Sequence, residues 1–416
     1  MANPDGIQIV PSRILDDLKQ LRKFGSIGQG VNRRSLTETD LASRHWLCER
    51  MRAAGMEAGI DGAGNVVGST PHSRRILIGT HTDTVPNGGW LDGALGVIYG
   101  LEIGRALMES PGNGDTGIEV MSFIDEEGRF TPIMGSRVFC GEIREDEFVE
   151  LRSAEGINFS EARCQAGLSD EPVHRLDPDI HVAYLEAHIE QGPVLDNRQI
   201  RIGVVTGIVG ASQYRISFHG QTNHAGTTPM SLRSDATMAM FEFMGCFKEY
   251  FNDVAGADTT WTCNEVRTEP RAGNVISNLA EFSIHYRDLS SDILAKLDRG
   301  VEEICREAAS GNNVTFNREK TVELVPTVMD EQLVDRIHNA SVECGASSHR
   351  MPSGAGHDAM IIGRYIPAGM LFIPSIGGLS HDTEEDSHEE DIRIGAQVFA
   401  RAVSNHINHL DCLSKA

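Results

Sequence analysis

The sequence predicts an α/β protein with a mixed, mainly parallel sheet that is interrupted by a smaller α+β domain. Three observations support this prediction. Apolar runs typical of strands alternate with helical patterns, and several of these runs end abruptly in polar loops. From about Gly210 onward, the pattern changes to alternating strands around a long helix. The 416 residues also exceed what one compact core normally uses, which indicates two domains.

The elements of the first domain follow one another in regular order. Thr37 and Asp40 resemble a capping box, and apolar residues then recur at helical spacing until Gly55. The next segments are a strand at 65–68, a strand at 75–80, a helix at 95–108 and a strand at 118–124. Such alternation is typical of a parallel sheet that is covered on both faces.

Two later strands, at 184–189 and 370–375, belong to the same domain and also lead into polar loops. Between them lies the segment of different texture. Its strands include 213–218 and 280–287, and its helix lies near 235–250. We therefore expect two domains. The inserted one is 209–326, and the other combines 1–208 with 327–416.

The composition excludes several classes of partner. Asp and Glu number 60 against 37 Lys and Arg, a formal charge of −23 that repels nucleic-acid phosphates and anionic lipids. The N-terminal residues lack a secretory signal pattern, and no run approaches the roughly 18 apolar residues of a membrane span, which predicts a cytoplasmic protein. The eight cysteines are scattered and are expected to be free thiols.

Five side chains at strand ends or helix starts offer ligands for divalent cations. Three imidazoles and two carboxylates suit zinc or, by substitution, manganese, cobalt or nickel. Their spacing alone identifies nothing, because a single loop histidine is more often a surface or core residue. Their convergence on the edge where α/β sheets bind ligands favours a metal site. The five residues are His81, Asp92, Glu127, His188 and His381.

Four acidic residues have roles to consider in this site. Asp92 is the candidate bridge between two cations, which need a shared anion to offset their repulsion. Asp83 is a candidate acceptor for the second ring N–H of His81, and the alternative is a turn aspartate. Adjacent carboxylates point in different directions, so Glu127 can bind metal while Glu126 accepts a proton from water. An acidic turn is the alternative for this pair.

Other polar loops offer groups for a substrate. His224 lies in a polar loop for which a hydrogen-bonding turn is the simplest account. Asn274 and Arg287 suit the binding of a carboxylate, although a strand arginine more often faces solvent. Gly356 stands among small residues at 353–360, where a ligand can approach the backbone. The sequence has no Walker loop, Gly-x-Gly-x-x-Gly turn or Gly-x-Ser-x-Gly elbow, so cofactor oxidoreductase and serine hydrolase functions have no support.

Six strings are familiar in combination. They are GTHTDTVPNGG with DGALGV at 79–97, DEEGRF at 125–130, HIEQGPVL at 188–195, GQTNHAGTTPM at 220–230, SGAGHDAM at 353–360 and PSxxGxSH at 374–381. Together, over nearly the whole chain, they resemble the hydantoinase/carbamoylase family of dinuclear-metal amidases. This family includes N-carbamoyl-L-amino acid hydrolases, beta-ureidopropionases and allantoate amidohydrolases.

The resemblance implies a zinc-peptidase-like catalytic domain that is interrupted by a smaller dimerisation or lid domain. It also implies two divalent metal ions per subunit, with zinc as the first candidate and manganese, cobalt or nickel as the others. One metal would be held by His81, Asp92 and His188, and the other by Asp92, Glu127 and His381.

The resemblance further implies roles in catalysis and substrate binding. Glu126 would be the general base and acid. The implied substrate-binding residues are Gln191, His224, Asn274, Arg287 and Gly356. In a homodimer, His224 and Asn274 would reach the partner's site, where His224 helps to stabilise the oxyanion.

The expected reaction is hydrolysis of the carbamoyl (ureido) C–N bond of an N-carbamoyl-L-amino acid to amino acid, ammonia and carbon dioxide. Allantoate, N-carbamoyl-beta-alanine, and N-acyl amino acids or dipeptides are alternative substrates. A non-catalytic metal-binding assembly protein is the alternative from another class. The chain departs from the family pattern at 277–278, at 285–286 and at Thr383, which bears on substrate identity more than on metal binding.

Overall fold

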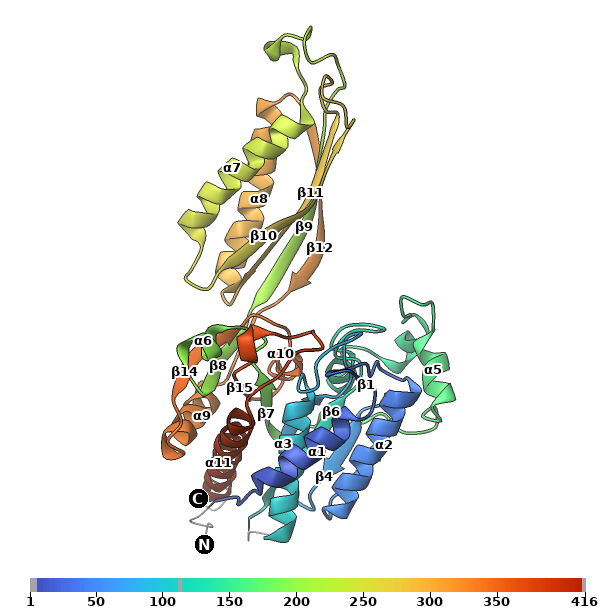
Figure 1. The fold of residues 1–416 in the computed structure, drawn as a ribbon, viewed down its shortest axis with the longest axis vertical. Coiled ribbons are helices and arrows are strands. Elements are labelled where there is room, and N and C mark those ends of the chain that lie inside the picture. Colours follow the sequence, from blue (N-terminus) through green and yellow to red (C-terminus); the bar gives the residue numbers. More distant parts are fainter. Residues whose placement is uncertain (1–5, 111–113, 414–416) are drawn as a thin grey trace. The chain divides into compact units, whose positions relative to one another are not determined.

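The structure is a computed structural model that describes residues 6–110 and 114–413, and the chain divides into two compact units (Figure 1). The larger unit comprises Met1–Thr206 and Val328–Ala416, and the smaller unit is Gly207–Thr327. The expected inserted domain, 209–326, lies inside the smaller unit. Among the described helices, none has the length and apolar character needed to cross a membrane.

A nine-stranded mixed sheet forms the centre of the larger unit, with the strand order β13-β8-β15-β7-β5-β6-β4-β3 and β14 beside β8. Its strands are β3 (Glu57–Ile60), β4 (Val66–Ser69), β5 (Arg74–His81), β6 (Thr116–Phe123), β7 (His181–Ile189), β8 (Ile202–Ile208), β13 (Thr327–Val328), β14 (Ser348–Ser353) and β15 (Ala368–Ile373). The neighbours β15, β7, β5 and β6 run parallel, whereas β3, β4 and β8 pair antiparallel. The predicted α/β class with a mixed sheet is confirmed, and the four central strands β15, β7, β5 and β6 form its parallel part.

The central strands are buried on both faces. Every residue of β6 and β15 is buried, as are the last six of β5. Successive side chains of a strand point to opposite faces, so both faces must be covered. Helix α3 packs on β5, β6 and β7, α4 packs on β6, α9 and α11 pack on β15, and α10 packs on β7 and β15.

The helices of this unit are α1 (Pro11–Arg22), α2 (Glu38–Ala53), α3 (Ala94–Glu109), α4 (Met134–Phe139), α5 (Phe159–Gln165), α6 (Val194–Arg198), α9 (Glu331–Glu343), α10 (Asp358–Ile362) and α11 (Glu389–Leu413). The predicted start of α2 is confirmed. The side chain of Thr37 accepts a hydrogen bond from the Asp40 main-chain N–H at 3.3 Å, and the Asp40 carboxylate accepts from the N–H of Leu36 at 2.9 Å. Gly55, with φ of 87°, follows the helix end.

The smaller unit is an antiparallel sheet with two helices. Its strands are β9 (Gly210–His219), β10 (Thr260–Glu269), β11 (Leu279–Asp288) and β12 (Thr315–Leu324), in the order β10-β11-β9-β12. Its helices α7 (Ala236–Val254) and α8 (Ser291–Gly311) pack side by side against this sheet (Figure 1). Aromatic rings join the layers: the Phe243 ring of α7 lies 5.2 Å from the Phe282 ring of β11, between ring centroids.

Candidate metal centre

Four parallel strands carry the predicted ligands to one edge of the sheet. His81 is the last residue of β5, and His188 is the next-to-last residue of β7. Glu126 and Glu127 follow the end of β6, and His381 follows β15. Because the carboxyl ends of parallel strands meet at one edge, residues far apart in the sequence come together there.

Asp92 lies among these side chains. Its Oδ1 atom is 3.0 Å from Nε2 of His188 and 3.8 Å from Nε2 of His81. Its Oδ2 atom is 3.3 Å from Nε2 of His381, which is in turn 3.6 Å from Oε2 of Glu127. The two carboxylate oxygens therefore face different histidines, as the oxygens of a bridging ligand must.

Glycine at position 93 allows this close approach. Gly93 has a φ of 66°, a conformation that L side chains rarely adopt. A Cβ atom at this position would lie 2.5 Å from Nε2 of His81. Asp92 therefore enters the site just before helix α3 only because the next residue has no side chain.

Hydrogen bonds fix the tautomers of two histidines. Nδ1 of His81 donates to the main-chain oxygen of Asp83 at 3.0 Å, and Nδ1 of His188 donates to that of Ile189 at 2.9 Å. A carbonyl only accepts, so both protons sit on Nδ1. The Gly93 N–H donates to Nε2 of His188 at 3.1 Å, which agrees with a lone pair on that atom. Both Nε2 atoms are thus suited to bind a metal.

Carboxylates are concentrated around this point. Burial and the neighbouring Glu127 raise the pKa of Glu126 well above its ordinary value, and burial and Asp92 do the same for the pKa of Glu127. Burial lowers the pKa of His81 to about 4, so its ring is neutral at pH 7. Within the described chain, the ion-pair partners of Asp92, Glu126 and Glu127 are histidines. This donor set fits divalent cations, whose charge would offset the clustered carboxylates.

The ligand atoms form overlapping groups within 4.8 Å of one another. One group contains His81, Asp92 and His188, and another contains Asp92, Glu127 and His381. Glu126 lies beside them, with Oε2 3.6 Å from Nε2 of His81 and a side chain that is 12% exposed. The geometry therefore allows two cation positions that share Asp92.

Asp83 differs from the prediction in one respect. Its main-chain oxygen, and not its carboxylate, accepts the ring N–H of His81; the carboxylate lies 3.8 Å from Nδ1. The carboxylate instead accepts from Oγ of Ser35 at 2.9 Å and from the main-chain N–H of Glu127 at 3.3 Å. Asp83 thus orders both the His81 loop and the loop that carries the paired glutamates.

Arg44 is a supporting residue that the sequence reasoning missed. It is fully buried in α2, pairs with Asp40 at 2.9 Å and lies 3.9 Å from Asp83. Its guanidinium also donates to the main-chain oxygens of Ser122 and Phe123, at the end of β6. The available signal was a charged residue on the apolar face of a helix, three positions after Leu41.

Comparison with known proteins agrees with this site. Residues 77–405 match Peptidase family M20/M25/M40. The chain belongs to this family. Members of the M20 family depend on divalent metals, in keeping with the donor set described above.

This M20 protein has relatives that are similar over more than nine-tenths of its length. It is 34% identical over 397 residues to the N-carbamoyl-L-amino acid amidohydrolase of Geobacillus stearothermophilus, covering 92% of the chain and 96% of the relative. It is 31% identical over 402 residues to the allantoate amidohydrolase of Bacillus subtilis (strain 168), covering 94% and 96%. A solved hydantoinase/carbamoylase family amidase from Burkholderia phymatum is 41% identical, with a TM-score of 0.91 and coverage of 97% and 99%. The predicted resemblance to these amidases is confirmed.

Two of the predicted substrate-binding residues of the M20 protein lie close to the ligands of the larger unit. Nε2 of Gln191 donates to both carboxylate oxygens of Asp92, at 3.3 and 3.2 Å. Gly356 precedes His357, whose ring centroid lies 4.6 Å from that of His188. The SGAGHDAM string thus borders the metal ligands.

The other three predicted substrate-binding residues lie in the smaller unit. His224 forms an isolated β-bridge with Val275, and the main-chain N–H of Ala225 donates to the main-chain oxygen of Asn274 at 2.9 Å. His224 and Asn274 are therefore neighbours, and the side chains of both are exposed. Arg287 is half-buried near the other end of β11, and burial lowers its pKa. Within one chain, the structure therefore does not bring Arg287 and Asn274 together.

A second imidazole–carboxylate cluster is formed by Glu119, His174 and His181, and His181 in it carries its proton on Nε2, unlike His81 and His188. Oε1 of Glu119 accepts from Nε2 of His174 at 2.7 Å and from Nε2 of His181 at 3.1 Å. Nδ1 of His181 accepts the N–H of Asp177 at 2.9 Å, so its proton sits on Nε2. Arg75 donates to the same carboxylate at 3.0 Å. The ligand atoms of Glu119, His174 and His181 also lie within 4.8 Å of one another. Because the Nδ1 lone pair of His181 and the charge of Glu119 already have partners within the protein, this cluster is described as a hydrogen-bonded network.

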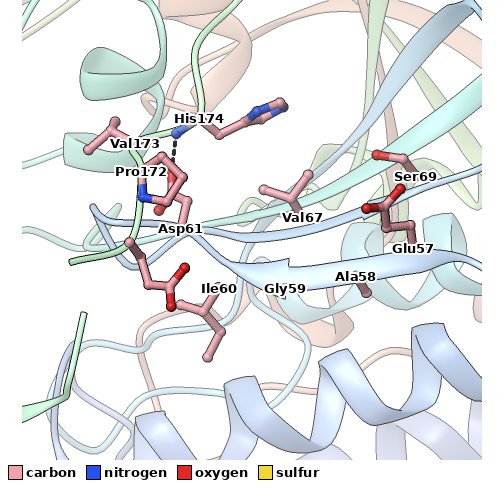
Figure 2. A pocket seen from close by; sticks show the side chains of 11 residues that line it. Glu57, Ala58, Gly59, Ile60, Asp61, Val67, Ser69, Pro172, Val173 and His174 are labelled. Atoms are coloured by element: carbon pink, nitrogen blue, oxygen red, sulfur yellow. Dashed lines mark hydrogen bonds between the residues drawn. The ribbon is translucent and has the colours of Figure 1, made fainter. Parts of the chain in front are cut away.

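A cavity of about 380 Å³ borders His174 (Figure 2). Its walls come from β3, β4 and residues 171–174, and the His174 main-chain N–H donates to Oδ2 of Asp61 at 3.1 Å. The predicted site residues are absent from its described lining. The cavity is therefore separate from the Asp92 site.

Proposed function

We propose that the chain hydrolyses the carbamoyl C–N bond of N-carbamoyl-L-amino acids to amino acid, ammonia and carbon dioxide. The observation that carries this proposal is the approach of three histidines to the two oxygens of Asp92, with Glu126 beside them. Relatives named as N-carbamoyl-L-amino acid and allantoate amidohydrolases, similar over more than nine-tenths of the chain, support the reaction class.

Two divalent cations are proposed for this centre. When bound, such cations polarise a carbonyl oxygen and lower the pKa of water toward neutrality. With three protein ligands, each cation would keep open coordination positions, as in catalytic zinc sites. Zinc is the first candidate, and manganese, cobalt or nickel accept the same donors. The proposed ligands are His81, Asp92 and His188 for one cation, and Asp92, Glu127 and His381 for the other.

Glu126 is the proposed general base and acid. It takes a proton from the attacking water, the new C–O bond forms at the carbamoyl carbon, and Glu126 returns the proton to the leaving nitrogen as the C–N bond breaks. The carbamic acid that is released decomposes to ammonia and carbon dioxide. The nearly buried carboxylate, with Oε2 3.6 Å from Nε2 of His81, supports this role because it lies beside the proposed metal ligands.

Substrate recognition is proposed for five residues: Gln191, His224, Asn274, Arg287 and Gly356. A guanidinium and an amide suit the carboxylate of the amino acid, and an imidazole suits the oxyanion that forms at the carbamoyl group. Because His224 and Asn274 lie apart from Arg287 in one chain, we propose that they act in the partner's site of a homodimer.

The smaller unit has a surface that supports its role in dimerisation. Large apolar side chains are exposed there: Met230 and Leu232 are each 72% exposed, and Phe241 of α7 is 60% exposed. Strand β10 is an edge strand of its sheet and carries Val266, which is 59% exposed. Exposed large apolar side chains and a free strand edge are each typical of an interface with another chain.

The experiment that tests the function is a substrate panel on metal-reconstituted protein with ammonia detection. We expect metal-dependent ammonia release from N-carbamoyl-L-amino acids and little from their D isomers. Absence of release across a broad panel would contradict the proposal.

Allantoate is the second candidate substrate, favoured by the 31% identity to the allantoate amidohydrolase of Bacillus subtilis. Values of kcat/KM for allantoate and for N-carbamoyl-L-amino acids, measured on one preparation, decide between them. A ratio above about one hundred, or nearly 3 kcal/mol in transition-state binding, would assign the substrate.

A further inference from the structure

Glu385 links two loops of the metal centre. It lies four residues after His381, in the segment between β15 and α11, and its side chain is buried. Oε1 accepts the main-chain N–H groups of Leu91 and Asp92, at 3.2 and 3.1 Å. Oε2 accepts the hydroxyl of Ser380 at 3.1 Å, directly before His381 in the sequence.

These contacts join parts of the chain that are 293 residues apart. One carboxylate therefore holds the backbone of Asp92 and the residue next to His381 at the same time. Because the carboxylate already accepts three hydrogen bonds, its lone pairs are directed at the protein backbone and at Ser380, which differs from the arrangement of a metal ligand.

Gly89 shows that this contact is tightly packed. A Cβ atom at Gly89 would lie 1.9 Å from Oε1 of Glu385 and 2.0 Å from its carboxyl carbon. The carboxylate can reach the N–H groups of Leu91 and Asp92 only because position 89 has no side chain. The absence of a side chain at Gly89 therefore serves the docking of Glu385.

We propose that Glu385 is a positioning residue of the metal centre, which sets the separation of Asp92 and His381 and thereby the affinity for divalent cations. The proposal rests on the metal centre proposed above. It differs from a role in overall folding, because it assigns the effect to hydrogen bonds that orient two ligands. Partners that orient metal ligands typically contribute about 10- to 100-fold to metal affinity.

The test measures Zn²⁺ affinity by competition with a chromogenic chelator on metal-free protein, for wild type, Glu385→Ala, Glu385→Gln and Gly89→Ala. Glu384→Gln is the matched control, since Glu384 is the exposed neighbouring acid. We expect Glu385→Ala and Gly89→Ala to weaken Zn²⁺ binding by about 10- to 100-fold. Glu385→Gln should stay within about threefold of wild type, because its amide oxygen still accepts both N–H groups and its NH₂ group reaches Ser380.

Thermal melting of each metal-free variant separates binding from folding, and affinities are compared well below the lowest melting temperature. Wild-type affinity in folded Glu385→Ala would overturn the proposal. An equal loss in Glu385→Gln would also overturn it, because the negative charge and not the hydrogen bonds would then act. If Glu385→Ala does not fold, Gly89→Ala and Glu385→Gln decide the question. Wild-type protein that binds no divalent cation would contradict the metal centre itself, and with it this proposal.

Discussion

Asn274 and Arg287 lie toward opposite ends of strand β11. Arg287 pairs with Ala211 at one end, and Leu279 pairs with His219 at the other. The eight-residue separation spans about 26 Å in an extended strand. Asn274 is held at the His219 end, because Gly220 and Asn278, and Asn223 and Ile276, are joined by main-chain hydrogen bonds. One substrate carboxylate therefore cannot contact both side chains of the same chain.

Complementation tests whether two chains share each site. When they are assayed at substrate concentrations well below the wild-type KM, the Arg287→Ala and Asn274→Ala homodimers are each expected to retain little activity. After mixing and subunit exchange, half of the dimers are mixed and one of their two sites is intact, so activity should return to about one quarter of wild type. Ammonia release before and after exchange measures this, and no gain despite confirmed exchange would contradict a shared site.

Replacing the proposed base should separate catalysis from metal binding. We expect Glu126→Gln to lower kcat by about 10²- to 10⁴-fold, because proton transfer is lost while the side chain keeps its size. Metal content, measured by elemental analysis, should match that of wild type. Glu384→Gln removes an exposed acid and serves as the control. A Glu126→Gln variant with full turnover would rule out this base.

Removal of the metal should change both activity and stability. Chelation should abolish ammonia release, and Zn²⁺ or Mn²⁺ should restore it. Cations that bind only the folded protein stabilise it, by about 2.7 kcal/mol at a concentration one hundred times Kd. A calorimetric scan with and without Zn²⁺ tests this, and an unchanged melting temperature at saturating Zn²⁺ would be inconsistent with the site.

Arg287 is expected to affect substrate affinity. Arg287→Ala should raise KM by about 10- to 100-fold, since a charge-assisted hydrogen bond to the carboxylate is lost in the ground state and the transition state alike. Metal content should be unchanged. Arg299→Ala, at an exposed position on α8, is the matched control. Wild-type kinetics in Arg287→Ala would remove this residue from the carboxylate site.

The Glu119 network should make stability depend on pH. Burial alone would lower the pKa of His174, but the hydrogen bond and charge of Glu119 outweigh it and raise this pKa above 6.5. A raised folded pKa adds stability that is complete below the unfolded value of 6.5 and is lost as the pH rises through the folded value. Wild type should therefore exceed His174→Gln most clearly at pH 5.5, and by less at pH 9. Urea unfolding at both values measures this, and a gap that widens with pH would contradict it.

Local signals in the sequence predicted much of the fold. The Thr37–Asp40 cap and the helical spacing after it depend on contacts within a few residues, so α2 was predicted close to its observed bounds. The strands that lead to His81 and His188 are mostly apolar, and their alternation with helices indicated a sheet covered on both faces. The sequence did not predict that β8 pairs antiparallel with β15, or that β4 pairs antiparallel with β6. The direction of a pairing depends on partners that are distant in the sequence.

The supporting residues around the metal ligands were harder to predict. Several contacts of Arg44 and Glu385 are with main-chain groups, and a main-chain N–H or C=O carries no residue-specific mark in the sequence. The same reason explains Asp83, whose carbonyl, in place of its carboxylate, fixes the His81 tautomer. The types of Asn274 and Arg287 suggested carboxylate binding, but their separation within one chain by an extended strand could not be measured from the sequence.

The sequence by itself determined the ligand types, the strand ends that carry them and the family to which the motifs belong. Only the tertiary structure decided which oxygen of Asp92 faces which histidine, which ring nitrogen keeps its proton, and that Asn274 and Arg287 of one chain lie apart. The physical reason is the distance along the chain over which the interactions act. Helix caps and strand patterns arise from neighbours along the chain, whereas distances of 3 to 4 Å between side chains such as Asp92 and His381 depend on how the whole sheet brings its strand ends together.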